Sequence, residues 1–167
     1  MRIRKEKEED IEGVRRVNEL AFGARAEADL VDALRDQAQP TISLVADNRG
    51  KIVGHIMFSP VVLKGHPNLS IMGLAPMAVL PIHQRNGIGT KLVHAGLKEC
   101  EKLEFGAVVV LGHPEYYPRF GFVPSSRFDL GCEYNVPEDV FMVKELREGY
   151  LRGATGIITY HAAFSNV

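Results

Sequence analysis

Up to Pro40, the order of apolar and polar residues predicts a short strand followed by two amphipathic helices. Met1–Arg4 is the expected strand. The charged residues 5–10 are expected to be a solvated helix start, because acidic side chains suit the positive end of a helix dipole. In the first helix, apolar residues at every third position are expected to share one face: Ile11, Val14, Val17 and Leu20. The second helix carries Leu30, Val31 and Leu34 and ends before Pro40.

From residue 42 onward the apolar residues alternate with polar ones, which predicts β-strands. Residues 42–58 are typical of an antiparallel hairpin with its turn at Asn48–Gly50. A loop is expected at Ser59–Pro67, and the next extended segment is Leu69–Val79. Pro76 lies within that segment and has no N–H to donate, so we predict a bulge there.

A second helix–strand pattern follows a glycine-rich turn. The expected helix has one apolar face: Ile88, Leu92, Val93, Gly96, Leu97 and Cys100. Ala107–Leu111 is uninterrupted and apolar, as in a strand that is covered on both faces. Strand, helix and strand over residues 69–111 predict a βαβ unit with parallel strands. Final strands are expected at Phe141–Leu146 and Ile157–Tyr160, and the polar segment Pro124–Pro137 is expected to face a substrate.

Length and composition favour one domain over residues 1–167, with a core of about 1–146 and a C-terminal extension, 147–167. The chain is 46% hydrophobic and 25% charged, which is typical of soluble globular proteins. A net charge of -1 argues against nucleic-acid binding. No secretory signal is seen, and no apolar segment reaches the ~20 residues that span a bilayer, so a cytoplasmic location without membrane partners is expected. Two cysteines without a C-x-x-C pair make a zinc site unexpected.

The segment Gln84–Thr90 lies where a predicted strand ends and a predicted helix begins. A helix N-terminus offers free N–H groups and partial positive charge, which suit a phosphate. Gly87 and Gly89 leave room for an anion to approach the backbone, while Gln84, Arg85 and Thr90 add donors. The segment therefore predicts a pyrophosphate site, although its spacing alone fits a connecting turn without a ligand equally well.

Three other phosphate-binding motifs do not fit this segment. The P-loop pattern G-x-x-x-x-G-K-S/T is absent. A dinucleotide pattern G-x-G-x-x-G starting at Gly87 meets Leu92 in place of its third glycine, and Val109 stands where the ribose-binding acid belongs. The set of kinase motifs is also missing.

Gln84-x-x-Gly87-x-Gly89 is similar to the Q/R-x-x-G-x-G/A signature of the GNAT superfamily of acetyl-CoA N-acyltransferases. Leu74–Val79 resembles the bulged fourth strand of that family, and Tyr116–Phe122 resembles its F/Y-Y-x-x-x-G-F segment. The order of predicted elements from residue 1 to about residue 146 also fits. The resemblance implies a mixed α/β fold, with two parallel strands that splay apart and helices on both faces of the sheet.

The resemblance also implies acetyl-CoA as co-substrate, without a metal. Backbone groups of Met77 and Val79 would pair with the pantetheine arm, and the N–H of Ala78 or Val79 would stabilise the oxyanion. The pyrophosphate would be held by the segment Gln84, Arg85, Asn86, Gly87, Ile88, Gly89 and Thr90. Tyr117 aligns with the tyrosine that protonates the departing thiolate in several members, and Tyr116 is the neighbour most easily confused with it.

Several questions stay open at the level of sequence. A base must deprotonate the amine, because an alkyl amine with a pKa near ~10.4 is almost entirely protonated at neutral pH. His55 and His113 are candidates for that base. The acceptor is expected to be a small-molecule or peptide amine, and a homodimer is expected by analogy. Alternatives are a non-catalytic acyl-CoA-binding or regulatory module, a nucleotide-phosphate binder, and an enzyme for longer acyl-CoAs.

Overall fold

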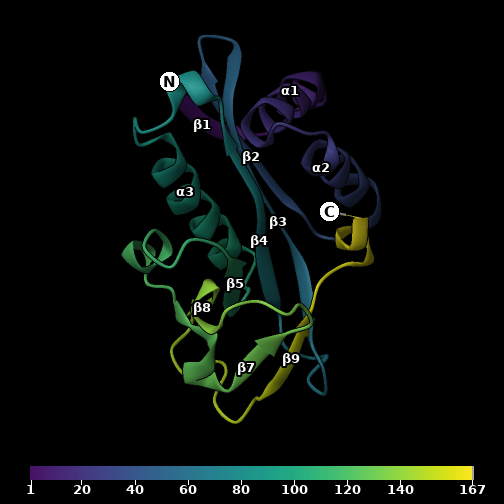
Figure 1. Ribbon diagram of the computed structural model, residues 1–167, viewed down its shortest axis with the longest axis vertical. Helices are drawn as coiled ribbons and strands as arrows, with labels where there is room; N and C mark the ends of the chain where they lie inside the picture. Colours follow the sequence, from purple (N-terminus) through teal and green to yellow (C-terminus); the bar gives the residue numbers. More distant parts are fainter. Residues whose placement is uncertain (167) are drawn as a thin grey trace.

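A mixed β-sheet of nine strands forms the centre of the molecule and carries helices on both faces (Figure 1). The computed structural model describes residues 1–166. The strands are β1 (Arg2–Lys5), β2 (Ile42–Asn48), β3 (Lys51–Leu63), β4 (Ile71–Val79), β5 (Ala107–Leu111), β6 (Val123–Pro124), β7 (Leu130–Cys132), β8 (Phe141–Glu145) and β9 (Gly156–Thr159). The α-helices are α1 (Ile11–Phe22), α2 (Ala26–Gln37) and α3 (Ile88–Lys102). Short 3-10 helices are η1 (Glu8–Asp10), η2 (Pro81–His83), η3 (Tyr117–Phe120), η4 (Ser125–Phe128), η5 (Glu138–Val140) and η6 (Ala162–Asn166).

The main sheet has the strand order β1-β2-β3-β4-β5-β8-β6, and β9 pairs with both β3 and β7. β2 and β3 form the predicted antiparallel hairpin. β4 and β5 are adjacent and parallel with α3 between them in sequence, so the predicted βαβ unit is confirmed. The predicted fold class is confirmed as well: a mixed sheet with helices on both faces.

The loop expected at Ser59–Pro67 is wrong in its first half, because β3 continues to Leu63. The side chains of Val61 and Leu63 are buried, whereas Val62 between them is exposed. Pro60 lies within this strand although a proline has no N–H for the ladder, so it is a local signal against a strand here. The continuation is paired on one side by β4 and, beyond the end of β2, by the distant strand β9 through Val62 and Leu63.

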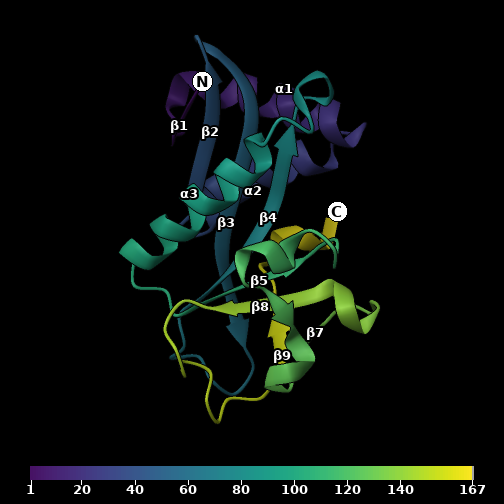
Figure 2. The ribbon, with the colours of Figure 1, turned by 90° about the vertical axis from the view of Figure 1, so that its left-hand side faces the viewer.

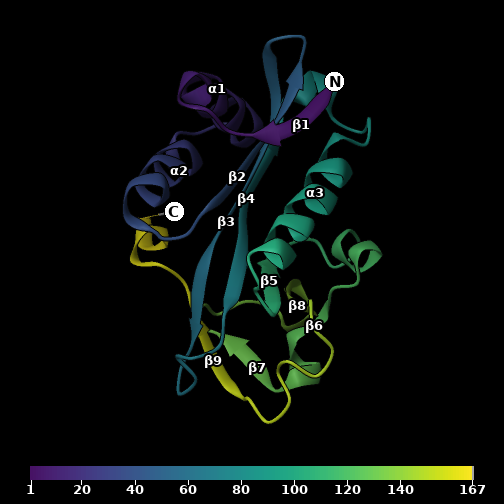
Figure 3. The same cartoon turned by 180° about the vertical axis from the view of Figure 1, so that it is seen from behind.

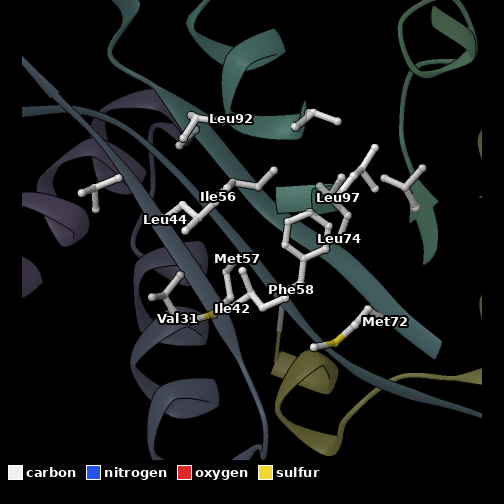
Figure 4. Packing of buried hydrophobic residues seen from close by; sticks show 14 of the residues in the cluster. Val31, Ile42, Leu44, Ile56, Met57, Phe58, Met72, Leu74, Leu92 and Leu97 are labelled. Carbon is white, nitrogen blue, oxygen red and sulfur yellow. The ribbon is translucent and has the colours of Figure 1, made fainter. Parts of the chain in front are cut away.

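The helices lie in two layers, with α3 on one face of the sheet and α1 and α2 on the other (Figures 1 and 3). Successive residues of a strand point to opposite faces, so Phe58 packs toward Leu97 of α3 while Met57 packs toward Val31 of α2 (Figure 4). Gly96 allows this close approach, because a Cβ there would overlap the Phe58 ring. The whole predicted apolar face of α3 is buried, as expected: Ile88, Leu92, Val93, Gly96, Leu97 and Cys100.

The face predicted for the first helix is wrong at its C-terminal end. Val14 and Val17 are buried, but the Leu20 side chain is 49% exposed and Asn18 is buried instead. An α-helix turns by about 100° per residue, so Leu20 lies about half a turn away from Ile11. A repeat of three drifts around the helix and does not keep one face buried.

The solvated helix start expected at residues 5–10 is confirmed for Lys5, Lys7, Glu8 and Glu9, which are exposed, but it is wrong for Asp10. Asp10 is buried and accepts two hydrogen bonds from the Arg4 guanidinium, at 2.7 and 3.0 Å. These bonds lower the pKa of the Asp10 carboxyl. Glu6 similarly pairs with Arg35 of α2 at 2.7 Å. The charges therefore fix β1 and α1 to the sheet, because an unpaired buried charge would be costly.

The C-terminal residues complete a second hydrophobic cluster below the first. Its buried members include Leu130 of β7, Val143 of β8, Leu151 and Ile158 of β9. Figure 2 shows β7, β8 and β9 together at one end of the molecule. The strands expected at 141–146 and 157–160 are confirmed within one or two residues. The extension 147–167 is thus part of the packed structure as far as residue 166.

Two further observations limit the kinds of site that residues 1–166 contain. None of the helices in that range has the length and apolar character needed to cross a bilayer. Nor does that range bring together three or more His, Cys, Asp or Glu side chains in an arrangement suited to a metal ion.

Candidate functional site

The two parallel strands separate after the first three of the nine residues of β4. Their pairing ends at Gly73 and Val109. Immediately beyond, the register of β3 and β4 shifts so that Ala75 and Pro76 both stand opposite Met57. This is the bulge predicted from Pro76. It directs the second half of β4 away from β5 and leaves a gap between the two strands.

A cleft of about 1010 Å³ occupies this gap. Its walls come from β4, the start of α3, the end of β5 and the segment around η3, and also from α1, α2 and the C-terminal residues. Because α3 and α1–α2 cover opposite faces of the sheet, the cleft passes through the sheet from one face to the other. Nine of the predicted site residues line it: Met77, Val79, Gln84, Arg85, Gly87, Ile88, Gly89, Thr90 and Tyr117. Ala78 and Asn86 are not among its lining residues.

The start of α3 presents free backbone donors to this cleft. The first hydrogen bond of the helix runs from the Lys91 N–H to the Gly87 oxygen, at 3.1 Å. The N–H groups of residues 88–90 therefore have no partner within the helix. Gly87 has φ 80°, a left-handed conformation that glycine adopts without strain, and a Cβ there would meet no other atom within 4 Å. Together these features make an open anion-binding terminus.

Two polar side chains of the turn bind the turn itself. The side-chain amide of Gln84 donates to the Val79 oxygen at 3.0 Å. The Asn86 amide donates to the His83 oxygen at 3.4 Å. In this structure both side chains therefore hold the turn against the end of β4, and the donors that face the cleft are backbone N–H groups and Arg85.

The pattern of backbone hydrogen bonds determines which groups of β4 face the gap. The Leu80 N–H donates to the Val53 oxygen at 2.9 Å. Hydrogen-bonded pairs alternate along an antiparallel ladder, so the next such pair is Ala78 with His55. The N–H groups of Met77 and Val79 are consequently directed away from β3. Of the two donors considered for an oxyanion, the Val79 N–H faces the gap and the Ala78 N–H faces β3.

Tyr117 lies in a ring of aromatic side chains at the edge of the cleft. Its side chain is 7% exposed and makes edge contacts with Tyr116 and Phe122, at centroid distances of 5.1 and 5.7 Å. Gly112 is required beside it, because a Cβ at that position would overlap the Tyr117 ring. Burial, and secondly the neighbouring Tyr116, raises the pKa of Tyr117 to about 12. The hydroxyl is therefore protonated at neutral pH and available as a donor.

Tyr116 and Arg119 also line the cleft, and Tyr116 lies beside the start of α3. The Tyr116 hydroxyl lies 3.4 Å from the Thr90 hydroxyl and next to Gly89. The Arg119 guanidinium stacks over the Tyr116 ring at 4.4 Å, and its Nε donates a hydrogen bond to the main-chain carbonyl oxygen of Tyr116 at 2.9 Å. Sequence reasoning did not select Arg119. Its spacing of three residues from Tyr116 is the only signal that would have pointed to this stack.

The two histidines considered as bases have very different positions. His113 is exposed and lines the cleft. His55 is fully buried under α1, and it does not line the cleft. Its Nδ1 lies 3.2 Å from the Asn18 amide nitrogen and its Nε2 lies 2.8 Å from the Ser43 hydroxyl. Burial, with a smaller contribution from the Arg35 charge, lowers the pKa of His55 to about 3. A direct role for His55 as the base is therefore not supported.

The other end of the cleft was largely missed by sequence reasoning. It is formed by residues from α1, α2, the segment after β7 and the C-terminus: Phe22, Glu27, Leu30, Tyr134, Tyr160 and Phe164. Only Tyr134 falls in the segment 124–137 that was expected to face a substrate. The others come from elements far apart in sequence, and no local motif connects them.

Comparison with known proteins places this arrangement in a family. The profile described as "Acetyltransferase (GNAT) domain" matches residues 2–124. The Escherichia coli K12 protein "Uncharacterized N-acetyltransferase YhbS" is 37% identical over 166 residues, which are 99% of each chain. A crystal structure of YhbS from Escherichia coli in complex with CoA superposes with a TM-score of 0.92 at 35% identity, over 98% of this chain and 91% of that one.

A second solved structure has the same fold. The GNAT family acetyltransferase from Brucella melitensis, in complex with acetyl-CoA, has a TM-score of 0.77 at 35% identity and covers 98% of this chain and 97% of its own. The profile match spans most of the sequence, and both relatives are at least 35% identical to this chain over nearly its whole length. The protein therefore belongs to the GNAT family of acetyltransferases.

Proposed function

We propose that this protein is an acetyl-CoA-dependent N-acetyltransferase that transfers an acetyl group to the primary amine of an acceptor by direct attack. The observation that carries the proposal is the cleft through the sheet. It joins the free N–H groups at the start of α3, the gap-facing edge of β4 and the Tyr117 side chain. The relatives solved with CoA and with acetyl-CoA support the same co-substrate.

The residues of the cleft fit the parts of this co-substrate. We propose that the N–H groups of residues 88–90, together with Arg85 and Arg119, hold the pyrophosphate. Free N–H groups at a helix N-terminus and arginine side chains both donate hydrogen bonds to anions. The N–H and C=O groups of Met77 would pair with the pantetheine amides as an added strand, which leaves the Val79 N–H free for the thioester carbonyl. Gln84 has a bracing role in this proposal, because its amide already occupies the Val79 oxygen.

Acetyl-CoA supplies an activated acetyl thioester, and the protein's task is to position it and to move two protons. We propose that the Val79 N–H stabilises the developing negative charge on the carbonyl oxygen. The Tyr117 hydroxyl would donate a proton to the departing sulfur, for which its burial keeps it protonated. His113, exposed on the cleft wall, is the remaining histidine candidate for accepting the proton of the incoming ammonium.

Two measurements test the function. Titration calorimetry should show that CoA binds more tightly than ATP or NAD, because the cleft continues past the phosphate site along β4. Release of CoA from acetyl-CoA, followed with a thiol reagent, should be stimulated by at least one amine in a broad panel. A preference for ATP or NAD would contradict the proposal. Tight CoA binding without turnover for any acceptor would favour a non-catalytic acyl-CoA-binding module.

A further inference from the structure

The two ends of the cleft differ in charge. At the start of α3, the lining includes Arg85, Arg119 and the positive end of the helix. At the other end, Glu27 in the first turn of α2 is the single acidic residue among the described residues that line the cleft. Glu27 is partly buried, and among residues 1–166 no cation forms an ion pair with it. The cleft therefore offers a carboxylate to whatever enters from the face of α1 and α2.

The same end is lined by aromatic rings. The Tyr160 ring packs at tilted angles against Tyr134 and Phe164, with ring centroids 5.8 and 5.1 Å apart. Phe164 lies in η6, which packs beside α2 (Figure 1). The C-terminal residues thus bring these rings to the helix that carries Glu27, and all four residues line the same cleft. We call these four residues, Glu27, Tyr134, Tyr160 and Phe164, the aromatic end of the cleft.

The Tyr160 hydroxyl is a second, independent feature of this end. Its oxygen is buried and has no hydrogen-bond partner among the described residues. The Tyr160 ring lies close to Gly73, at 3.0 Å from the position of a Cβ there. Gly73 is the last residue of β4 that pairs with β5. An unsatisfied polar group thus stands where the gap between the strands begins, and buried polar groups normally have a partner.

We propose that the aromatic end selects an acceptor that carries one ammonium group on an aromatic body. This rests on the proposed function and names the substrate class of the same site. The Glu27 carboxylate and the ring faces, both of which attract a cation, draw the ammonium into the cleft, and the same amine, once deprotonated, attacks the thioester beside the Val79 N–H. The aromatic body packs against Tyr134, Tyr160 and Phe164. A polyamine is a poor match, because its second charge would be desolvated against apolar walls without a carboxylate.

Binding of 2-phenylethylamine to the CoA-loaded protein tests this proposal without requiring turnover. Two probes each remove one feature of it. Phenylalanine adds a carboxylate next to the ammonium, and n-butylamine lacks the ring. We expect calorimetry to show that each binds about tenfold more weakly than 2-phenylethylamine, a difference of about 1.4 kcal/mol.

Matched variants assign the preference to residues. Glu27→Gln should weaken 2-phenylethylamine binding about tenfold and bring its affinity closer to that of phenylalanine, while the affinity for CoA stays unchanged. Glu12→Gln is the control, because Glu12 is an exposed residue of the neighbouring helix α1 and does not line the cleft. Tyr134→Leu should reduce the preference for 2-phenylethylamine over n-butylamine, since it removes one ring from the stack.

Several results would overturn the proposal. It is wrong if Glu27→Gln binds 2-phenylethylamine as well as the unaltered protein does, or if phenylalanine or n-butylamine binds equally tightly. It is also wrong if 2-phenylethylamine binds neither the free nor the CoA-loaded protein. Failure of the proposed function is separate: it is seen as absent CoA binding or absent acetyl transfer, whereas the amine titrations still report on Glu27 and the rings.

Discussion

Among single residues, Tyr117 has the environment that a proton donor needs. Its hydroxyl is kept protonated by burial, and the ring is fixed by Gly112, Tyr116 and Phe122. We expect Tyr117→Phe to lower kcat about 100-fold, the range of one general acid, with a change in CoA affinity of less than about twofold. Steady-state kinetics and a CoA titration on the same variant measure both quantities.

Tyr116→Phe is the control for that experiment. It removes the hydroxyl that lies beside Thr90 and Gly89 at the start of α3, so its effect should fall on the KM for acetyl-CoA more than on kcat. If Tyr117→Phe turns over at the rate of the unaltered protein, Tyr117 is not the acid. A larger loss of kcat in Tyr116→Phe would assign that role to its neighbour.

The buried His55 ring leads to a prediction of how the free energy of unfolding depends on pH. The ring is neutral in the folded protein, where its pKa is lowered to about 3 from the ordinary histidine value of 6.5. The unfolded chain therefore binds a proton first as pH falls below 6.5, and the folded state loses stability until the pH approaches 3. Between pH 7 and pH 5 this group alone should cost about 2 kcal/mol of unfolding free energy.

Urea denaturation at the two pH values checks this. The variant His55→Gln is expected to be less stable at pH 7, because the contacts with Asn18 and Ser43 are altered. Its further loss on going to pH 5 should be smaller than that of the unaltered protein by about 2 kcal/mol. An equal loss in both proteins would mean that His55 does not stay neutral in the folded state.

Some of the residues at the cleft could be predicted from the sequence, and others could not. Gly87, Gly89 and Tyr117 were predicted because short local motifs contain them, and the structure brings them to one cleft. The bracing bonds of Gln84 and Asn86 were not predicted, since a sequence does not show whether an amide faces a ligand or its own backbone. Glu27 gave no signal at all, because its partners at the cleft come from segments over a hundred residues away.

For elements, the contact between α3 and β3 depends on the absence of a side chain at Gly96. A methyl group at Gly96 would gain up to about 1 kcal/mol of helix propensity. It would also overlap the ring of Phe58, which is fully buried. Overpacking costs about 1–3 kcal/mol, so we expect Gly96→Ala to be destabilising overall.

The matched control for Gly96→Ala is Gly153→Ala. Gly153 is exposed and a Cβ there would meet no atom within 4 Å, although its φ of 77° strains an alanine. Thermal unfolding should show that Gly96→Ala is less stable than the unaltered protein. Its near-ultraviolet circular dichroism spectrum, which reports on the packing of aromatic rings, should also change. The control should lose stability without that spectral change. A stabilised Gly96→Ala protein would show that α3 can shift away from β3.

Predictions for elements succeeded where the signal was local. The apolar face of α3 and the strand 107–111 were visible as periodicity and as an uninterrupted apolar segment. The end of β3 was mispredicted because Pro60 is a local signal for a break, whereas pairing with β9 is a contact across almost a hundred residues. The exposure of Leu20 could have been predicted from the sequence by comparing the three-residue repeat with the 3.6 residues per turn of an α-helix.

On the scale of the whole molecule, the question is whether two hydrophobic clusters make one domain. The first contains the helices and the second contains β7, β8 and β9. They are not separated by a linker, because β3, β4 and β5 each contribute buried side chains to both clusters. A break between the clusters would have to separate three continuous strands. We therefore propose a single cooperative domain, as the length of the chain predicted.

The distribution of chromophores makes this testable without a label. All three α-helices lie before residue 103, so ellipticity at 222 nm reports on the first cluster. All five tyrosines lie after residue 115 and there is no tryptophan. Tyr150 and Tyr160 pack against the second cluster, whereas Tyr116 and Tyr117 pack with the first, so tyrosine fluorescence reports on the second cluster and on its border with the first at the cleft. In a two-state protein the urea transitions followed by the two probes coincide. Transitions with different midpoints would show that the C-terminal half unfolds separately, and that the shared strands do not transmit stability from α3 to the aromatic end.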